Sequence, residues 1–377
     1  MKKYFQNRLV LLSAFFTVVI AGCAAVPPVT DLPSDYQLNQ VGSLGKGDAV
    51  AWHPDGERFS AAGKRLMVGS VDGNLVTIDG DDPAAIAWSP TGAVLAASFI
   101  DGTETTVRLY DVDTWNKIAE IAVEGRARDL AFIDDTALLI ASVLLKEYSF
   151  GANYTVRLYT WRQNEPLAYD TIADTSPLKS FLEALGDSIY DSVHLQISPF
   201  RDEILYTKLL LTPNAGRKAQ LVVRHLATGR ERIVAALPAT SSGGRYLAKG
   251  DAIFFSDGAY QSIKGSIWGT EPYETYLPGL RLEISPGGRY KLIDNALLKD
   301  REEILKFKVL DSAAFSPDGS KLLLLADGTL FLLSFFDDAV VDRPSATPKL
   351  LELRSWRSEG LISPQEFLRY QRQLENR

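Results

Sequence analysis

Few side chains in this sequence are suited to chemistry. Cys23 is the only cysteine among 377 residues, and histidine occurs as His53, His194 and His225. A single thiol excludes an intramolecular disulfide but remains a strong nucleophile. The histidines are far apart in sequence, and no HExxH motif or cysteine pair accompanies them. We therefore expect no metal site, no cofactor and no catalytic group, and look to Cys23 first.

The residues before Cys23 have the layout of a secretory signal peptide. Positive charge comes first, at Lys2, Lys3 and Arg8. An apolar run over 9–20 and two small residues then lead to the cysteine, so we expect residues 1–22 to direct export. The run is too short to span a bilayer, which needs about 20 residues. Removing the signal changes the formal net charge from −7 to −10, which disfavours nucleic-acid binding.

The stretch IAGC, residues 20–23, closely resembles the lipobox of bacterial lipoproteins. In that family the cysteine thiol receives a diacylglyceryl group, and the chain is cut just before it. The resemblance implies lipidation of Cys23 with palmitate-type chains, each buried CH₂ adding about 0.8 kcal/mol of membrane affinity. A buried cysteine in an uncleaved anchor helix is the alternative. Ala24 and Ala25, with no aspartate beside the cysteine, resemble the pattern sent to the outer membrane of Gram-negative bacteria, facing the periplasm.

The next segment, residues 23–35, contains three prolines together with small residues and aspartates. This composition predicts an extended tether that lifts the folded part away from the membrane.

One phrase recurs along the remaining chain. It reads AVAWHPDG at 49–56, AIAWSPTG at 85–92, LQISPF at 195–200, LEISPGG at 282–288 and AAFSPDG at 313–319. In SPDG the proline fixes the first corner of a turn, and the glycine takes the positive φ that closes a hairpin. Further turns and apolar strands complete a unit of four antiparallel strands in about 31 to 45 residues. That length and order are typical of a β-propeller blade.

We therefore predict an all-β fold, a β-propeller over residues 36–336. Seven blades should begin near residues 49, 85, 129, 193, 246, 281 and 312, with six or eight blades as the alternatives. The last blade has only three strands, so residues 36–44 should supply its outer strand and close the ring.

Two resemblances agree with the predicted propeller. The stretch VRLYDVDTWNKI, residues 107–118, resembles part of a WD40 repeat, and the FSPDG phrases resemble TolB-type repeats. No Gly-His pair or Trp-Asp dipeptide stands at the WD40 positions. The resemblance implies the architecture and says almost nothing about function.

An insertion at residues 171–192 breaks the rhythm of the repeats. Ser176 and Pro177 indicate a helix start, apolar residues follow at helical spacing, and Gly186 should end the helix. We expect a short helix that caps one propeller face, with a partner-docking helix as the alternative.

The carboxy-terminal tail follows a linker at 337–348. Residues 349–377 closely resemble the SHOCT family of short helical hairpins, through the matching residues Gly360, Leu361, Ile362, Ser363, Glu366 and Phe367. The resemblance implies a small α-hairpin that supports self-association or docking. Two helices of about ten residues are marginal alone in water, so the hairpin needs a surface to pack on.

Other charged or histidine-bearing stretches have ordinary structural interpretations. We expect His53 to be a turn residue, and His194 to lie near the central channel, where it lacks the partners of a catalytic base. A cluster of acids at Asp79, Asp81 and Asp82 is interpreted as a solvated turn, with calcium binding as the alternative. The basic stretch 216–232 is interpreted as a solvated blade face, the alternative being an anion-binding patch.

These features predict a membrane-anchored, exported lipoprotein whose propeller binds envelope proteins at one rim. A propeller enzyme, a hydrolase or lyase acting at the central channel, is the alternative. A cluster of His, Asp, Glu or Arg at the channel mouth would favour the enzyme.

Overall fold

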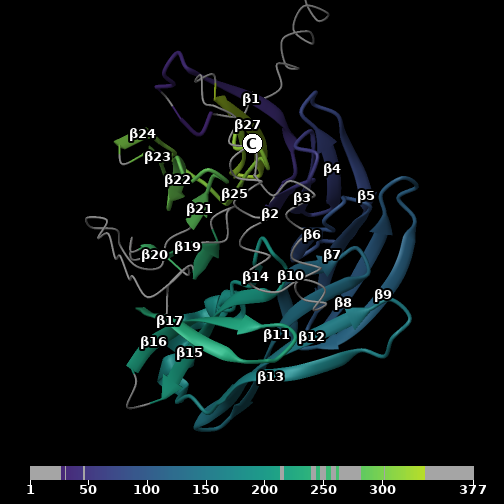
Figure 1. The fold of residues 1–377 in the computed structure, drawn as a ribbon, viewed down its shortest axis with the longest axis vertical. Helices are drawn as coiled ribbons and strands as arrows, with labels where there is room; N and C mark the ends of the chain where they lie inside the picture. The colour runs from purple at the N-terminus through teal and green to yellow at the C-terminus, as the bar shows by residue number, and fades with distance from the viewer. Residues whose placement is uncertain are drawn as a thin grey trace, which may run out of the picture.

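The computed structural model describes residues 27–29, 31–45, 47–212, 216–238, 243–246, 252–255, 260–262, 282–300 and 302–335. These residues form antiparallel sheets that follow one another around a common axis, seen end-on in Figure 1. Cys23, the predicted signal, the linker 337–348 and the predicted α-hairpin 349–377 lie outside the described residues. Within them, no helix has the length and hydrophobicity needed to cross a membrane.

The sheets are numbered 1 to 7 in chain order. Sheet 1 contains β2 (Gly47–Trp52), β3 (Arg58–Gly63), β4 (Leu66–Ser70) and β5 (Leu75–Asp79). Sheet 2 contains β6 (Ala85–Trp88), β7 (Val94–Asp101), β8 (Glu104–Asp111) and β9 (Lys117–Glu124). Sheet 3 contains β10 (Arg126–Asp134), β11 (Ala137–Tyr148), β12 (Gly151–Arg162) and β13 (Ala168–Thr175). Sheet 4 contains β14 (Gln196–Ile197), β15 (Glu203–Thr212), β16 (Gly216–His225) and β17 (Glu231–Pro238).

The remaining sheets complete the ring. Sheet 5 contains β18 (Gly244–Tyr246), β19 (Ala252–Phe255) and β20 (Tyr260–Ser262). Sheet 6 contains β21 (Leu282–Ile284), β22 (Tyr290–Ile293), β23 (Ala296–Lys299) and β24 (Glu302–Lys306). Sheet 7 contains β25 (Ser312–Phe315), β26 (Lys321–Ala326), β27 (Thr329–Phe335) and β1 (Tyr36–Ser43).

The described residues therefore form an all-β propeller with one short α-helix. Six of its sheets are complete four-stranded blades. Sheet 5, at the position of the predicted fifth blade, has three strands among the described residues. Among the described residues the structure thus shows six complete blades and not the predicted seven, and six was one of the two alternatives. The repeat phrase is faint in this part of the sequence, so the turn chemistry that marks the other blades is weakest here.

The amino-terminal strand closes the ring, as predicted for residues 36–44. β1 pairs antiparallel with β27, from Tyr36 opposite Phe335 to Ser43 opposite Thr329. The Tyr36 and Phe335 rings pack edge to face, with their centroids 5.9 Å apart. The innermost strand of sheet 7, β25, contacts both β2 of sheet 1 and β21 of sheet 6. The first and last strands of the propeller therefore share one blade.

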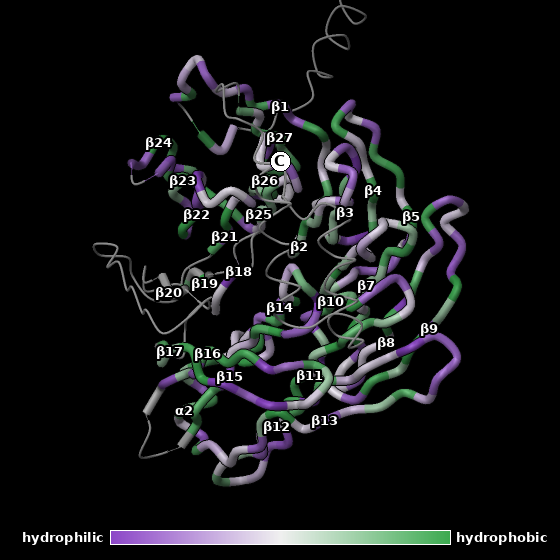
Figure 2. Tube along the Cα trace, viewed as in Figure 1, coloured by the Kyte–Doolittle hydropathy of each residue, from purple (hydrophilic) through white to green (hydrophobic). Residues whose placement is uncertain are grey.

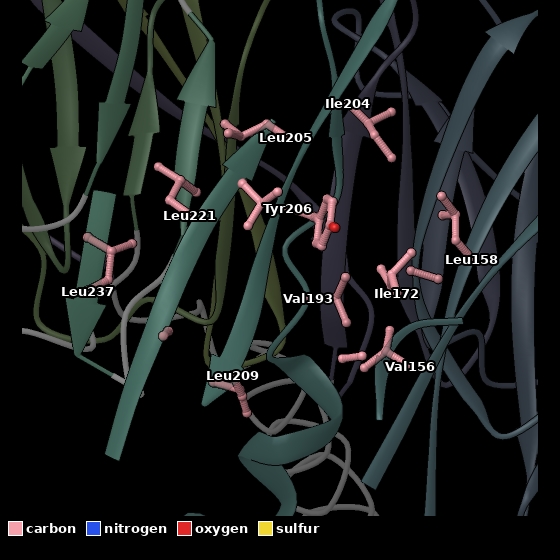
Figure 3. Packing of buried hydrophobic residues seen from close by; sticks show 14 of the residues in the cluster. Val156, Leu158, Ile172, Val193, Ile204, Leu205, Tyr206, Leu209, Leu221 and Leu237 are labelled. Carbon is pink, nitrogen blue, oxygen red and sulfur yellow. The ribbon is translucent and has the colours of Figure 1, made fainter. Parts of the chain in front are cut away.

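Each sheet buries both of its faces against its neighbours. In sheet 4, Ile204 and Tyr206 point towards Val156 and Ile172 of sheet 3, whereas Leu205 points the other way (Figure 3). This two-sided burial explains why the strands are continuously apolar and do not alternate. Hydrophobic stretches lie within the strands, and hydrophilic stretches lie at many of the turns (Figure 2).

A repeated ion pair joins the outer parts of neighbouring sheets. An arginine on the third strand of one sheet reaches an acid on the outer strand of the sheet before it, in the pairs Arg108–Asp79, Arg157–Glu124 and Arg224–Asp170. The Arg108 Nη1 atom lies 2.9 Å from Asp79 Oδ2, and the Arg224 Nη2 atom lies 2.6 Å from Asp170 Oδ2. These pairs link sheets 1 to 4 in sequence. Because each arginine side chain is at most 23% exposed, the pairs fix the order of the blades more firmly than fully exposed pairs would.

Part of the predicted tether is packed on the propeller. The Lys308 backbone N–H donates to the Pro28 carbonyl oxygen (N···O 2.8 Å), and the Val29 side chain is buried with Tyr36 and Phe307. The packing of Pro28, Val29 and Leu32 departs from the prediction that the whole of residues 23–35 forms an extended spacer. The apolar side chains Val29 and Leu32, placed between the prolines, provide the surface for this packing.

The insertion between sheets 3 and 4 forms a short helix, as predicted, although it begins later than Ser176. α2 (Lys179–Leu185) is followed directly by the 3₁₀ helix η1 (Gly186–Asp191). Gly186 ends α2 with φ +52°, a conformation that suits glycine. η1 packs on β10 and β11 of sheet 3, so the insertion covers part of one propeller face.

Removing residues 36–43 should destabilise the whole propeller. β27 would lose its outer partner, and buried Tyr36 would lose packing of roughly 2 to 3 kcal/mol by itself. We expect the free energy of unfolding in urea to fall by several kcal/mol. Ile118→Ala, an exposed change on the outer strand β9, should shift it by no more than about 0.5 kcal/mol. An unchanged urea midpoint in the deletion variant would show that β1 is not needed for closure.

Candidate functional site

The innermost strands around the axis are joined by side-chain hydrogen bonds. On one side of the ring, tryptophan performs this role. The Trp52 Nε1–H donates to the Ala314 carbonyl (N···O 2.8 Å), which links sheet 1 to sheet 7. The Trp88 Nε1–H donates to the Ala51 carbonyl (3.3 Å), which links sheet 2 to sheet 1. Both tryptophans end the inner strand of the repeat phrase, so their roles follow from the repeat.

On the other side of the ring, polar and charged side chains take over. Asp129 Oδ1 accepts the Leu195 backbone N–H (3.1 Å) and links sheets 3 and 4. Gln196 Oε1 accepts the Tyr246 backbone N–H (2.7 Å) and links sheets 4 and 5. Arg245 and Glu283 form an ion pair (Nη2···Oε1 3.2 Å) that links sheets 5 and 6. We call Asp129, Gln196, Arg245 and Glu283 the inner polar group.

The difference between the two sides is visible at one repeat position. This position lies two residues before the first residue of the turn that follows the inner strand. Sheets 7, 1 and 2 have Ala314, Ala51 and Ala87 there, whereas sheets 4 and 6 have Gln196 and Glu283. Ala314 and Ala51 need no polar side chain to join the sheets, because a tryptophan from the next sheet donates to the backbone carbonyl of each. The larger polar residues are therefore specific to one half of the ring centre, and this half is the candidate functional site.

Asp129 has the most unusual electrostatic environment of the inner polar group. Burial raises the pKa of its carboxyl, and the nearby Asp191 adds to the increase. Hydrogen bonds from the Leu195 and His194 backbones and the charge of Arg245 act in the opposite direction. The balance places the pKa of Asp129 at about 7, so this carboxyl exchanges its proton near neutral pH. Such a group suits general acid or base chemistry, and it also suits binding that depends on protonation.

His194 lies beside this site, two residues before the inner strand β14. Its backbone has φ +50°, in the left-handed region, and its backbone N–H contributes to the hydrogen bonding of Asp129. The backbone of His194 thus links it to Asp129.

His53 is a turn residue, as expected, and it is buried against the next blade. Its Nε2 atom lies 3.1 Å from the Gly92 carbonyl oxygen, and its ring packs edge to face on Trp88 at 4.7 Å. A Cβ atom at Gly92, where φ is +80°, would lie 1.9 Å from His53 Nε2. The histidine therefore depends on glycine in the turn of sheet 2, and its role is structural.

The acidic and basic stretches are used within the fold. Arg108 Nη1 lies 2.9 Å from Asp79 Oδ2 and 2.7 Å from Asp81 Oδ2, so an arginine occupies the place considered for calcium. In the basic stretch 216–232, Arg224 pairs with acids on two strands. These contacts favour the structural interpretation of both stretches. Among the described residues, no group of three or more His, Cys, Asp or Glu side chains is arranged to hold a metal ion.

The sequence motifs did not predict a role for Asp129, Gln196, Arg245 or Glu283. One signal was available, because LQIS and LEIS carry polar residues where the other repeat phrases carry alanine. Asp129 and Arg245 had no such marker, since both lie in blades whose repeat phrase is faint.

Comparisons with known proteins support the fold alone. No family model matches the chain, and no curated protein matches it. The solved structures that it resembles include the β-propeller domain of Cps50 (Swd1) from Myceliophteria thermophila, with 10% identity, 79% of this chain and 99% of that chain covered, and a TM-score of 0.53. A chain of the Mitotic Checkpoint Complex has 13% identity, 83% of this chain and 95% of that chain covered, and a TM-score of 0.51. This likeness shows that the chain has the β-propeller fold of WD40 type.

Replacing Asp129 with asparagine should stabilise the protein at neutral pH. The folded-state pKa of about 7 lies above the usual 3.8, so ionisation favours the unfolded chain as the pH rises between these values. The stability of the natural protein should fall by up to about 1.4 kcal/mol per pH unit across this window. Asparagine can still accept the Leu195 N–H, so the variant should lack this loss.

Urea unfolding at a series of pH values measures the effect. The two proteins should have similar stability near pH 4, and Asp129→Asn should be more stable at pH 7. Asp113→Asn changes an exposed acid in the turn between β8 and β9 and controls for the lost charge. A stability gap between Asp129→Asn and the natural protein that does not vary with pH would contradict the elevated pKa.

Proposed function

We propose that this protein is an exported lipoprotein, anchored through Cys23, whose propeller binds other proteins of the cell envelope. The lipobox-like IAGC and the signal layout before it support export and acylation. The absence of aspartate after the cysteine supports a location at the outer membrane of a Gram-negative bacterium, facing the periplasm.

The ring architecture is the observation that carries the binding role. Propellers present rigid loops at two faces, and the likeness to a chain of a protein complex agrees with such a use. In this chain, inter-sheet hydrogen bonds and ion pairs hold the blades in fixed positions. A preorganised surface lowers the entropy lost on binding.

The inner polar group is the proposed recognition site. Arg245 and Glu283 are only about a quarter exposed, so a partner that desolvates them meets a fixed pair of opposite charges. Such pairs contribute specificity because a wrong partner leaves them unpaired. The tail 349–377 adds self-association or docking to this role in the proposal, through its SHOCT-like hairpin.

A propeller enzyme, a hydrolase or lyase, is the second candidate function. The pKa of Asp129 favours it, because a carboxyl that titrates near pH 7 suits a general acid or base. Against it, the hydrogen bond from His194 to this carboxyl comes from the backbone, whereas the histidine of a hydrolase triad bonds its acid through the ring. Asp129→Asn tests the enzyme, since it should abolish any turnover that depends on this carboxyl.

Changing Cys23 to serine should leave the protein without its acyl chains. A serine hydroxyl lacks the nucleophilicity of the thiol, so the lipid cannot be attached. Cells grown with labelled palmitate should yield a labelled natural protein and an unlabelled Cys23→Ser variant. Ala25→Ser serves as a control next to the same site. Palmitate incorporated into Cys23→Ser would rule out this anchor.

Disturbing the inner polar group should weaken partner binding. Glu283→Gln removes one charge of the Arg245–Glu283 pair while keeping a similar shape. After crosslinking and affinity capture from membranes, the variant should retain less of each specific partner than the natural protein. Glu302→Gln, an exposed change on the outer strand β24, is the matched control. Equal capture by both variants would move the binding surface away from the ring centre.

A further inference from the structure

Three exposed apolar side chains gather at one projecting point of the propeller. Tyr148 is 50% exposed, Phe150 is 81% exposed and Leu178 is 46% exposed. We call these three residues the apolar tip. The other large exposed apolar residues of the described chain are dispersed, and four of them, Val76, Ile118, Tyr169 and Ile233, each lie on the outer strand of a different sheet.

The apolar tip is held in place by backbone pairing. β11 and β12 form an unbroken ladder from Ala137 opposite Arg162 to Tyr148 opposite Gly151. At its end, Gly151 forms a bridge with Leu178, and the Ala152 N–H donates to the Pro177 carbonyl (3.2 Å). The insertion therefore braces the long hairpin, and the aromatic side chains are displayed from a supported structure.

The strand order assigns the apolar tip to one face of the disc. In every antiparallel blade, turns between the first and second strands lie at one face, together with turns between the third and fourth. The Val112 N–H bond to the Ala93 carbonyl joins two such turns. Turns between the second and third strands lie at the opposite face with the connections between blades, as the Gly125 N–H bond to the Thr103 carbonyl shows. We call these the hairpin face and the connection face, and the turn at 149–150 belongs to the connection face.

The amino-terminal segment leaves the propeller at this same face. Pro28 is bonded to Lys308, which lies on the connection between β24 and β25. Five peptide steps separate Cys23 from Pro28 and span at most about 17 Å. An acyl group on Cys23 would therefore hold the connection face close to the bilayer. The two points lie apart on the disc, since β1 and β12 stand at opposite sides of the ring (Figure 1).

We propose that the apolar tip inserts into the bilayer interface and that the propeller lies with its connection face on the membrane. This inference rests on the proposed acylation of Cys23. Aromatic side chains with one polar end favour the interfacial region, and a bare phenylalanine gains by leaving water. Lys146, Glu147, Lys179 and Glu183 surround the tip with balanced charge, so the occupant is a zwitterionic lipid surface and binding does not require anionic lipids.

A single fluorescent label tests the docking. Cys23 carries lipid in the acylated protein, so Phe150→Cys provides the one free thiol for an environment-sensitive nitrobenzoxadiazole dye. The acylated full chain is placed in phosphatidylcholine vesicles with or without spin-labelled acyl chains. Ile118→Cys carries the same label at a 55% exposed site at the start of β9, next to the hairpin face.

The label at position 150 should shift to the blue and lose fluorescence to the spin-labelled lipid. The label at position 118 should remain as in water. Intact mass reports acylation of the same samples. An acylated protein whose two labels behave alike would overturn the docking and leave the anchor standing, with a protein partner as the occupant of the tip. A chain that carries no lipid and does not float with vesicles would overturn the anchor and the docking together.

Discussion

The need of each sheet to cover two apolar faces governs this structure. A single blade such as sheet 4 exposes Ile204 and Tyr206 on one side and Leu205 on the other, and only neighbouring blades can bury both. A row of such blades would leave two unsatisfied ends. The ring removes the ends, and β1 completes it by pairing the start of the fold with its last strand. Stability is therefore shared around the circle, and the loss of one closing strand affects every blade.

Polar contacts give the apolar ring its order. Hydrophobic packing alone would allow a sheet to pack against several different neighbours. The arginine–carboxylate pairs between successive sheets form only when the two sheets have one relative position. At the centre, tryptophan N–H groups do the same for sheets 7, 1 and 2 at little electrostatic cost. The inner polar group links sheets 3 to 6 with polar and charged side chains, and burial there raises the pKa of Asp129.

The sequence predicted the features that neighbouring residues determine, but it did not predict contacts between residues that are far apart in the chain. The SPDG phrases predicted the hairpins because proline, aspartate and glycine specify a turn within four residues, and the missing strand of the last blade pointed to β1. The links of Asp129 to Leu195 and of Arg245 to Glu283 cross between blades, 66 and 38 residues apart, and no local pattern encodes them. The tether was misjudged for a related reason. Its prolines indicate an extended chain, but Val29 and Leu32 find a surface that only the folded ring provides.

The two faces of the disc divide the proposed tasks. A bilayer against the connection face leaves the hairpin face for protein partners. The turns there are already rigid, because the hydroxyls of Ser89, Ser198, Ser285 and Ser316 each accept the backbone N–H of the residue five positions later. A partner that binds these turns has little loop entropy to remove, so even a modest interface can be specific. The serines that stabilise these four hairpins thus also fix the shape of the surface that a binding scaffold presents.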